Sequence, residues 1–328
     1  MRSEIDWSLR PTYSPDQLSR YFDRINFPQR YRESTIIKNG ASADNQAALS
    51  LLETLQRYQL AAVPFENLSL HYSVHRNISI DAQSVFEKVV DSNSDRGGYC
   101  MENNVIFGTV LRSLGYNTTS VGGRVNEAVQ PMSTSKNWTG PKFQGWNHMI
   151  NIVAIGEQKY LVDVGFGSNG PHRPMPLVHG FEFHNVGEQY GRLLYGPITQ
   201  QTLKGQSLWQ YELNHGKDTW IPAYCFTEVE FLPEDFTIIN YYISRSRESW
   251  FTFHIVCVRM LLDEKGENVV GDLTLFNDTL KRRIGARSEV LQCFASEEER
   301  LAALEKYFNI YLSRADQASI RHTISEIL

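Results

Sequence analysis

One cysteine has surroundings that could make it a nucleophile. Cys100 follows the glycine pair Gly97-Gly98, and apolar residues with helical spacing continue downstream to Gly115, where a left-handed helix cap is expected. Cys100 is therefore predicted to lie at a helix N-terminus, where unpaired N–H groups and the helix dipole favour thiolate over thiol. The alternative is that Cys100 is a small buried hydrophobic residue, the usual role of a free cysteine.

A thiol nucleophile needs a base, and the base needs a group that orients it. His148 opens one β-type run and Asp163 closes the next, with Gly156-Glu157 between them as a predicted two-residue type II′ turn. Counting back from that turn places His148 and Asp163 on the same face, about 7–8 Å apart at the backbone. A carboxylate in this apolar segment is costly unless it is hydrogen-bonded, and a histidine N–H would satisfy it. Cys100, His148 and Asp163 are therefore predicted to form a Cys-His-Asp triad. The alternative is that Asp163 lies at a strand end and faces water.

The hydrophobic pattern predicts the elements that must position these residues. The predicted helices cover residues 14–25, 44–58, 81–90, 100–114 and about 296–311. The predicted strands lie within residues 119–125, 148–155, 159–164, 226–231 and 251–258. Residues 131–143, rich in Ser, Thr, Lys, Pro and Gly, are predicted to form a long exposed loop. The order is helices, then a sheet or barrel, then a sheet with a helix.

Charge and composition argue against several classes of function. The formal net charge of −5, without a Lys/Arg-rich run, argues against nucleic acid or an anionic membrane surface as a partner. The N-terminus lacks the apolar core of a signal peptide and no run is as long as a membrane span, so a cytoplasmic protein is expected. The four cysteines form no C-x-x-C pair, so neither a metal site nor a disulfide framework is predicted. A small-molecule or protein partner is expected.

Two further segments combine proline or glycine with polar residues. Pro64 forces an extended backbone, and the Phe-Glu-Asn that follows is interpreted equally well as functional or as a helix-capping turn. Residues 165–170 match G-x-G-x-x-G, but Pro171 follows instead of a helix. Dinucleotide binding is therefore not predicted.

Several separated motifs in this order resemble the arylamine N-acetyltransferase family. Residues 96–100 match its R-G-G-x-C motif, residues 63–68 contain its P-F-E-N-L motif and residues 163–167 match D-x-G-F-G. The likeness continues into the last third, where residues 235–242 resemble the start of the family's third domain. The resemblance implies an α+β multidomain fold with a cysteine-protease-like core. Its implied parts are a helical bundle at 1–115, a β-barrel at 116–224 and an α/β lid at 225–328.

The resemblance also implies a reaction. Cys100 would attack an acyl-CoA thioester, with His148 as base and Asp163 orienting it, and the acyl group would pass to an arylamine, hydrazine or hydroxylamine in a ping-pong sequence that detoxifies xenobiotics. Acyl-CoA would be a co-substrate, with no tightly bound cofactor. The matching acceptor-side positions are Phe65, Val125 and Phe166. The matching coenzyme-side positions are Gln144 and Gly145. Arg245, Arg247 and Ser249 are expected beside the same coenzyme site.

The third domain departs from the family pattern. Where many members read S-P-x-S-x-F, residues 246–251 read Ser-Arg-Glu-Ser-Trp-Phe. Arg245 and Arg247 could pair with the extra carboxylate of malonyl-CoA, contact the coenzyme phosphates or lie on the surface. Acetyl-CoA, malonyl-CoA and propionyl-CoA are therefore all expected as donors to test. The rival functions are a thiol amidase or peptidase, a transglutaminase-like enzyme with the same triad, and a non-catalytic binding module.

Overall fold

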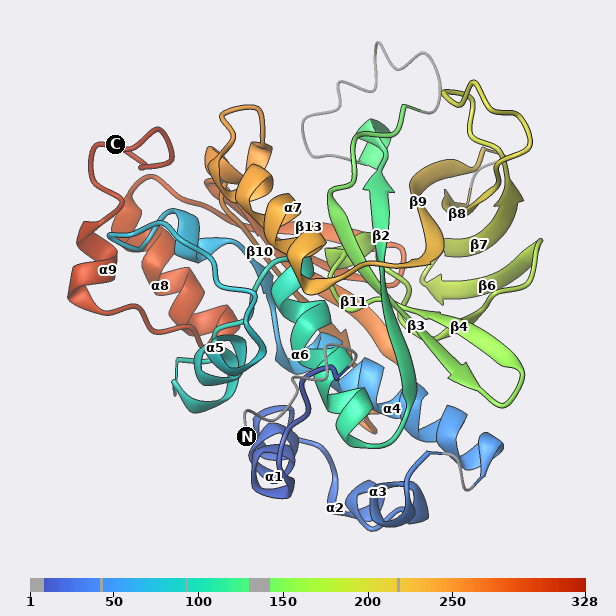
Figure 1. Cartoon of the computed structure of the whole chain (residues 1–328). Coiled ribbons are helices and arrows are strands. Elements are labelled where there is room, and N and C mark those ends of the chain that lie inside the picture. Colours follow the sequence, from blue (N-terminus) through green and yellow to red (C-terminus); the bar gives the residue numbers. More distant parts are fainter. Residues whose placement is uncertain (1–8, 42–43, 93, 130–141, 217–218) are drawn as a thin grey trace, which may run out of the picture.

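The computed structural model describes residues 9–41, 44–92, 94–129, 142–216 and 219–328. Most of the predicted loop at 131–143 lies outside these residues. Figure 1 shows a large sheet on one side, helices on the other, and α6 (Cys100–Ser113) between them. No helix within these ranges combines the length and the apolar character needed to cross a membrane.

The helices begin where side chains cap their first backbone N–H groups. Ser14 and Gln17 form the predicted capping box of α1 (Pro15–Arg24), and Asp44 caps α4 (Asn45–Ala62). The predicted helix at 81–90 is α5 (Ala82–Phe86) followed by a π-helical turn. The other helices are α2 (Gln29–Arg32), α3 (Thr35–Asn39), α7 (Pro233–Arg245), α8 (Glu297–Phe308) and α9 (Arg314–Ala318). The predicted positions of the helices around 14–25, 44–58, 100–114 and 296–311 are confirmed.

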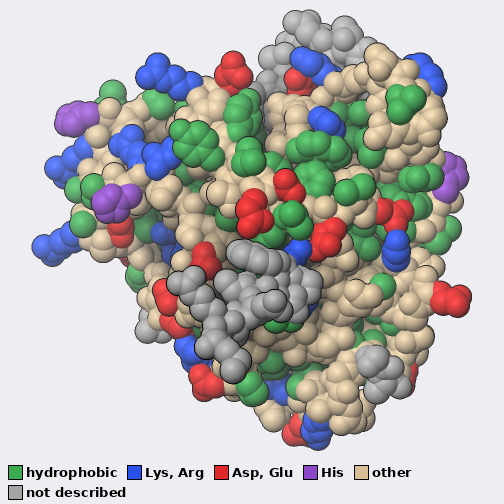
Figure 2. Space-filling view, viewed as in Figure 1, with side chains coloured by type: hydrophobic (Ala, Val, Ile, Leu, Met, Phe, Trp, Pro, Cys, Tyr) green, Lys and Arg blue, Asp and Glu red, His purple; other side chains and the backbone are tan. Residues whose placement is uncertain are grey.

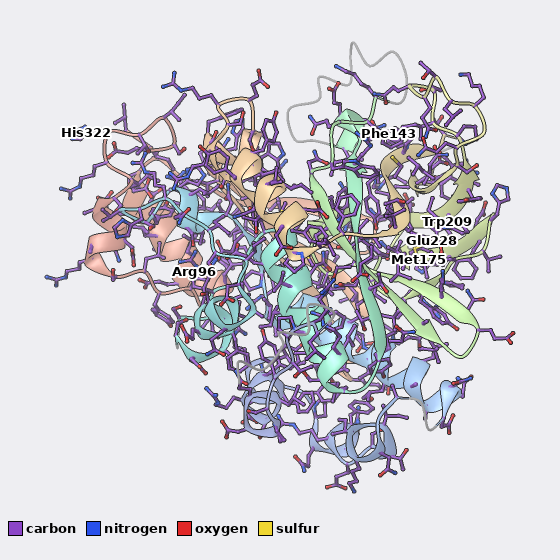
Figure 3. All side chains as sticks on the ribbon, viewed as in Figure 1. Arg96, Phe143, Met175, Trp209, Glu228 and His322 are labelled. Atoms are coloured by element: carbon purple, nitrogen blue, oxygen red, sulfur yellow. The ribbon has the colours of Figure 1, made fainter. Side chains whose placement is uncertain are left out.

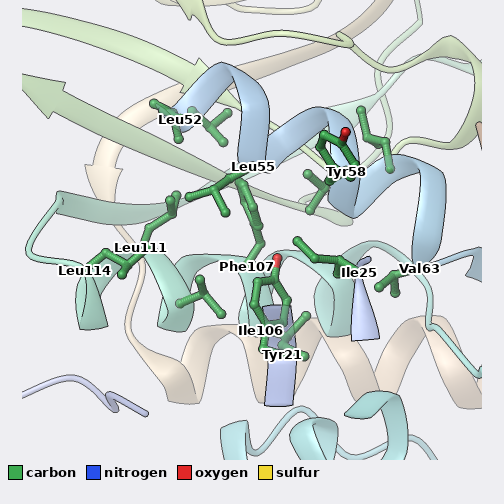
Figure 4. Packing of buried hydrophobic residues seen from close by; sticks show 14 of the residues in the cluster. Tyr21, Ile25, Leu52, Leu55, Tyr58, Val63, Ile106, Phe107, Leu111 and Leu114 are labelled. Carbon is green, nitrogen blue, oxygen red and sulfur yellow. The ribbon is translucent and has the colours of Figure 1, made fainter. Parts of the chain in front are cut away.

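One apolar core joins the N-terminal helices to α6. Side chains from the α1 segment, α4 and α6 point toward one another in Figure 4. The labelled members of this core include Tyr21, Leu52, Leu55, Ile106 and Phe107, which are all buried. Burying each such side chain contributes about 1.5–3 kcal/mol, so the helix that carries Cys100 is firmly held.

The larger sheet is antiparallel, barrel-like and eight-stranded within the described residues, in the order β5-β4-β3-β2-β9-β8-β7-β6. Its strands are β2 (Asn117–Val125), β3 (His148–Ile155), β4 (Gln158–Val162), β5 (Met175–Pro176), β6 (Phe181–Val186), β7 (Gln189–Gly196), β8 (Leu208–His215) and β9 (Ile221–Glu230). Trp209 and Glu228, neighbours in Figure 3, join β8 to β9 because the indole N–H donates to the carboxylate at 2.9 Å. Helix α6 packs against β2 and β3 of this sheet.

The smaller sheet, in the order β1-β10-β11-β12-β13, combines strands from distant parts of the chain. Its strands are β1 (Phe65–Glu66), β10 (Val256–Leu262), β11 (Val269–Phe276), β12 (Thr279–Ile284) and β13 (Arg287–Cys293). Phe65 of β1 pairs with Val258 of β10, so the segment at 63–68 is tied to the last third of the chain. Apolar residues of the smaller sheet share a core with α8.

Two sequence interpretations of the last third need correction. The strand predicted at 251–258 begins only at Val256, because residues 250–252 form a 3₁₀ turn, η5 (Trp250–Thr252).

Helix α7 was not predicted. Its buried residues Phe236, Ile239 and Ile243 have helical spacing, but Ile238 and Tyr241 are 71% exposed, and such exposed apolar residues blur the pattern. Hydrophobic side chains are visible over this part of the surface in Figure 2.

The division into domains at residues 115 and 224 stays a prediction. Two strands connect the predicted domains, one through its pairing with a distant strand and one because it spans a predicted boundary. Strand β1 belongs to the predicted helical part but pairs with β10, and β9 runs continuously through residues 224 and 225.

Candidate active site

The predicted nucleophile is the first residue of α6. Cys100 is 4% exposed, and its Sγ lies 4.0 Å from the backbone oxygen of Asn147. The carboxylate of Glu102 accepts a hydrogen bond from the Tyr99 N–H at 3.1 Å. The backbone donor of the residue that precedes the helix thus has a partner. A Cβ on Gly98 would lie 2.4 Å from the Cβ of Glu102, so a side chain there would disturb the helix start. The predicted helix N-terminus at Cys100 is confirmed.

His148 and Asp163 meet as the hairpin register predicts. Ile155 pairs with Gln158 across the turn, and Gly156 has the positive φ of 58° that its position requires. His148 opens β3, Asp163 follows β4, and their Nε2 and Oδ2 atoms are 2.7 Å apart. Both side chains are almost completely buried.

Opposing effects set the charge of this pair. Burial by itself lowers the pKa of His148, but the carboxylate of Asp163 and the neighbouring Cys100 side chain raise it above the usual value. Burial raises the pKa of Asp163, but His148, the amide of Asn104 and the Gly165 N–H hold it below the usual value. The structure therefore favours an ionised carboxylate beside a protonated imidazole. Cys100 is thus the second side chain, after Asp163, that favours the charged ring.

The strand end that carries Asp163 approaches the start of α6 very closely. A Cβ on Gly165 would lie 2.6 Å from the Cα of Cys100 and 2.6 Å from the Nδ2 of Asn104. Real Cβ atoms do not come this close to their neighbours. The glycine of the D-x-G-F-G segment therefore lets Asp163 and Cys100 lie side by side.

Cys100 and His148, two members of the predicted triad, line a cavity of about 490 Å³. Five predicted substrate-side or coenzyme-side residues also line it, namely Phe65, Val125, Gln144, Phe166 and Ser249. Further aromatic lining that the sequence interpretation missed comes from Tyr242, Trp250, Phe251 and Phe276. This lining suits a flat aromatic ring beside the nucleophile.

Three predicted coenzyme-side residues are not placed on the cavity. Gly145, Arg245 and Arg247 are not among its lining residues, and Arg245 donates a hydrogen bond to the Asn77 side chain at 3.1 Å. Among the lining residues within the described ranges, Lys281 is the one lysine or arginine. An arginine pairing with a donor carboxylate thus has no support from this arrangement. The reason is the missed helix α7, which ends at Arg245 and directs that side chain outward.

The segment at 63–68 contributes both to the cavity and to a buried ion network. Glu66 is fully buried, and its carboxylate lies 2.9 Å from Arg96 and 3.4 Å from Lys88. Burial raises the pKa of Glu66, but Arg96 and Lys88 lower it more, to about 2. The ion pair ties this segment to the residues before Cys100, while Phe65 faces the cavity. Both interpretations left open by the sequence find support: Phe65 lines the cavity, and the Glu66 carboxylate accepts a hydrogen bond from the Leu68 N–H at 2.6 Å, at the start of a 3₁₀ turn.

Comparison with known proteins agrees with this arrangement. A family model described as N-acetyltransferase matches residues 48–317. The N-malonyltransferase FDB2 of Fusarium pseudograminearum is 41% identical over 313 residues, covering 92% of this chain and 91% of that protein. The arylamine N-acetyltransferase of Escherichia coli is 30% identical over 260 residues, covering 79% of this chain and 76% of that protein. The chain belongs to the arylamine N-acetyltransferase family. It is an acyltransferase.

The fold of this family member also matches solved structures. The structure of Mycobacterium marinum arylamine N-acetyltransferase in complex with CoA superposes with a TM-score of 0.72 at 22% identity. The match covers 94% of this chain and 99% of that chain. Helices around a barrel-like antiparallel sheet are therefore the shared architecture.

Proposed function

We propose that this acyltransferase uses Cys100 to carry an acyl group from coenzyme A to an aromatic amine. The observation that carries the proposal is the placement of Cys100 at the start of α6, beside the His148–Asp163 pair and facing an aromatic-lined cavity. Hydrazines and hydroxylamines are included as acceptors because they present a similar nucleophilic nitrogen. Phe65 and Phe166 would contact the acceptor ring, and Gln144 and Ser249 would border the coenzyme.

The proposed reaction has two half-reactions. In the first, the Cys100 thiolate attacks the thioester carbonyl, the carbon–sulfur bond to coenzyme A breaks, and the leaving thiolate takes the proton held by His148. In the second, the acceptor amine attacks the acyl-cysteine, the carbon–sulfur bond to Cys100 breaks, and His148 accepts the amine proton. Asp163 keeps the imidazole oriented and stabilises its charged form throughout.

Malonyl-CoA is the proposed donor. The relative named N-malonyltransferase is 41% identical, whereas the Escherichia coli arylamine N-acetyltransferase is 30% identical. Acetyl-CoA and propionyl-CoA are the alternatives, since both carry the same thioester. The donors differ at the acyl end, so the residues that choose between them must be tested directly.

The test is to mix the protein with one acyl-CoA in the absence of acceptor. We expect about one equivalent of free coenzyme A per protein and a mass increase of one acyl group on Cys100, fastest with malonyl-CoA. Adding an arylamine should then remove the mass increase and yield the N-acylated product. Cys100→Ala should show neither step while keeping the thermal midpoint of the wild type.

Two outcomes would contradict the proposal. If no short acyl-CoA releases coenzyme A, the thiol hydrolase or transglutaminase-like alternative is favoured. If Cys100→Ala retains the burst, another residue is the nucleophile.

A further inference from the structure

A buried asparagine contacts all three elements that carry the proposed triad. Asn104 lies on α6, four residues after Cys100, and is fully buried. Its Nδ2 donates to Asp163 Oδ1 at 2.9 Å and to the backbone oxygen of Met149, next to His148, at 2.8 Å. Its Oδ1 accepts from the Val164 N–H at 3.2 Å. One amide therefore joins the nucleophile helix, the histidine strand and the aspartate segment.

The hydrogen bond from Asn104 to Asp163 comes from the helix that carries Cys100, unlike the other hydrogen bonds that this carboxylate accepts. Oδ2 of Asp163 is occupied by His148, and Oδ1 also accepts from the Gly165 N–H at 2.8 Å. Gly165 is two residues away in the same segment, so its hydrogen bond links the carboxylate to its own segment and not to α6. Asn104 is on α6, so its amide fixes the carboxylate relative to Cys100.

The amide of Asn104 is itself held in place. Both of its hydrogen-bonding atoms are used, and the Asn151 side chain on β3 donates to the Asn104 backbone oxygen at 2.9 Å. The neighbouring Asn103 offers a contrast: its Nδ2 donates to the Pro64 oxygen at 3.3 Å, and its buried Oδ1 has no partner among the described residues. Two adjacent buried asparagines thus differ in their connection to the triad.

We propose that Asn104 is a positioning residue that sets the orientation of the Asp163 carboxylate and, through it, the charged state of His148 and Cys100. Without the amide, Oδ1 loses its donor from α6 and the carboxylate can rotate away from the imidazole. A less firmly held carboxylate stabilises the imidazolium less, so the thiolate–imidazolium pair forms less readily. This proposal rests on the proposed role of Cys100 as nucleophile.

The test measures how pH affects alkylation of Cys100 by iodoacetamide, followed at this residue by mass spectrometry. Alkylation needs the thiolate but neither donor nor acceptor. In Asn104→Ala and Asn104→Leu we expect the acid limb to move to higher pH, with about a tenfold slower reaction on that limb for each unit moved. kcat/KM should fall about 100-fold, because misorientation of a catalytic group is costly. Leucine fills the space of the amide, so it covers the case in which the alanine variant does not fold.

Asn103→Ala is the matched control. It removes a buried asparagine from the same helix without touching Asp163, so its alkylation profile should equal that of the wild type. Folded Asn104 variants that keep the wild-type acid limb would overturn the proposal, even if kcat/KM fell, because that pattern indicates packing alone. Failure of the proposed function is distinguishable: the wild type would release no coenzyme A, whereas the shift of the acid limb in the Asn104 variants would still be seen.

Discussion

The two sides of the cavity differ in how firmly their polar side chains are held. On the side of α6, β3 and β4, His148, Asp163 and Asn104 are at most 1% exposed and are hydrogen-bonded to one another or to the backbone. On the opposite rim, Glu248 and Lys281 line the same cavity but are exposed to solvent. The residues of the proposed reaction thus lie in a buried network, while the charged side chains on the rim are exposed to solvent.

The difference follows from the cost of an unpaired polar group. Removing one member of a buried charged pair costs about 3–5 kcal/mol, because its partner stays buried without compensation. An exposed charge is solvated by water and screened by salt, so its removal changes little. Substitutions of charged residues on the rim should therefore leave both the fold and the reaction intact.

The largest effect is expected for Asp163→Asn on the buried side. The substitution keeps the shape of the side chain but removes the charge that raises the pKa of His148. It can also favour the wrong imidazole tautomer, and in a comparable triad this costs about 10⁴-fold in kcat. The measurement is the rate of N-acylation of an arylamine under saturating donor. A loss of less than tenfold would mean that Asp163 is a structural residue.

The same variant has a predicted pH dependence of stability. The raised pKa of His148 stabilises the fold below about pH 6.5 and this contribution is lost as pH rises toward the raised value. The lowered pKa of Asp163 stabilises the fold above about pH 4 and this contribution is lost on further acidification. The difference in unfolding free energy between wild type and Asp163→Asn should therefore be largest between about pH 4 and pH 6.5. A difference that did not vary with pH would contradict the charged pair.

An intermediate effect is expected for thiol reactivity. Alkylation of Cys100 by iodoacetamide at neutral pH should be the fastest of the four cysteines, since Cys100 begins α6 and lines the cavity next to His148. Burial raises the pKa of Cys225 to about 12 and that of Cys257 well above its usual value, so both should react slowly. Cys293 is exposed and serves as the ordinary thiol for comparison. If Cys100 instead reacted no faster than Cys293 at neutral pH, an activated thiol at Cys100 would be ruled out.

The smallest effect is expected for Lys281→Ala on the rim. Lys281 pairs with Thr274, which pairs with Val258, which pairs with Phe65, so it lies three strands across the small sheet from the acceptor side. At about 4.8 Å per strand, the backbones of Lys281 and Phe65 are roughly 14 Å apart, so Lys281 lies away from the part of the cavity that Phe65 lines. We therefore expect a rise of about fivefold or less in KM, equal for malonyl-CoA and acetyl-CoA.

Arg245→Ala and Arg247→Ala are the matched controls for Lys281→Ala, since each removes an exposed cation that does not line the cavity. Both should leave KM for either donor unchanged. Loss of malonyl transfer alone in an arginine variant would instead support the pairing predicted from the sequence. The same loss in Lys281→Ala would make Lys281 the cation that binds the carboxylate.

Local signals in the sequence were sufficient to predict the helix start at Cys100 and the meeting of His148 with Asp163. The glycine pair before Cys100 and the helical spacing after it indicate a helix start, and both depend on contacts between neighbouring residues. The register of His148 and Asp163 follows from the turn at Gly156, because a two-residue hairpin turn sets the pairing of both strands. These predictions needed no knowledge of the rest of the chain.

Contacts between distant segments were decided only by the tertiary structure. The sequence shows that Asn104 lies one helical turn after Cys100, but its bond to Asp163 crosses 59 residues of chain. The pairing of β1 with β10 and the outward direction of Arg245 on α7 depend in the same way on how the sheets and helices pack. Helix caps and hairpin turns are short-range and can be read from neighbouring residues, whereas the partners of a buried amide or a rim cation depend on packing between elements that no local pattern encodes.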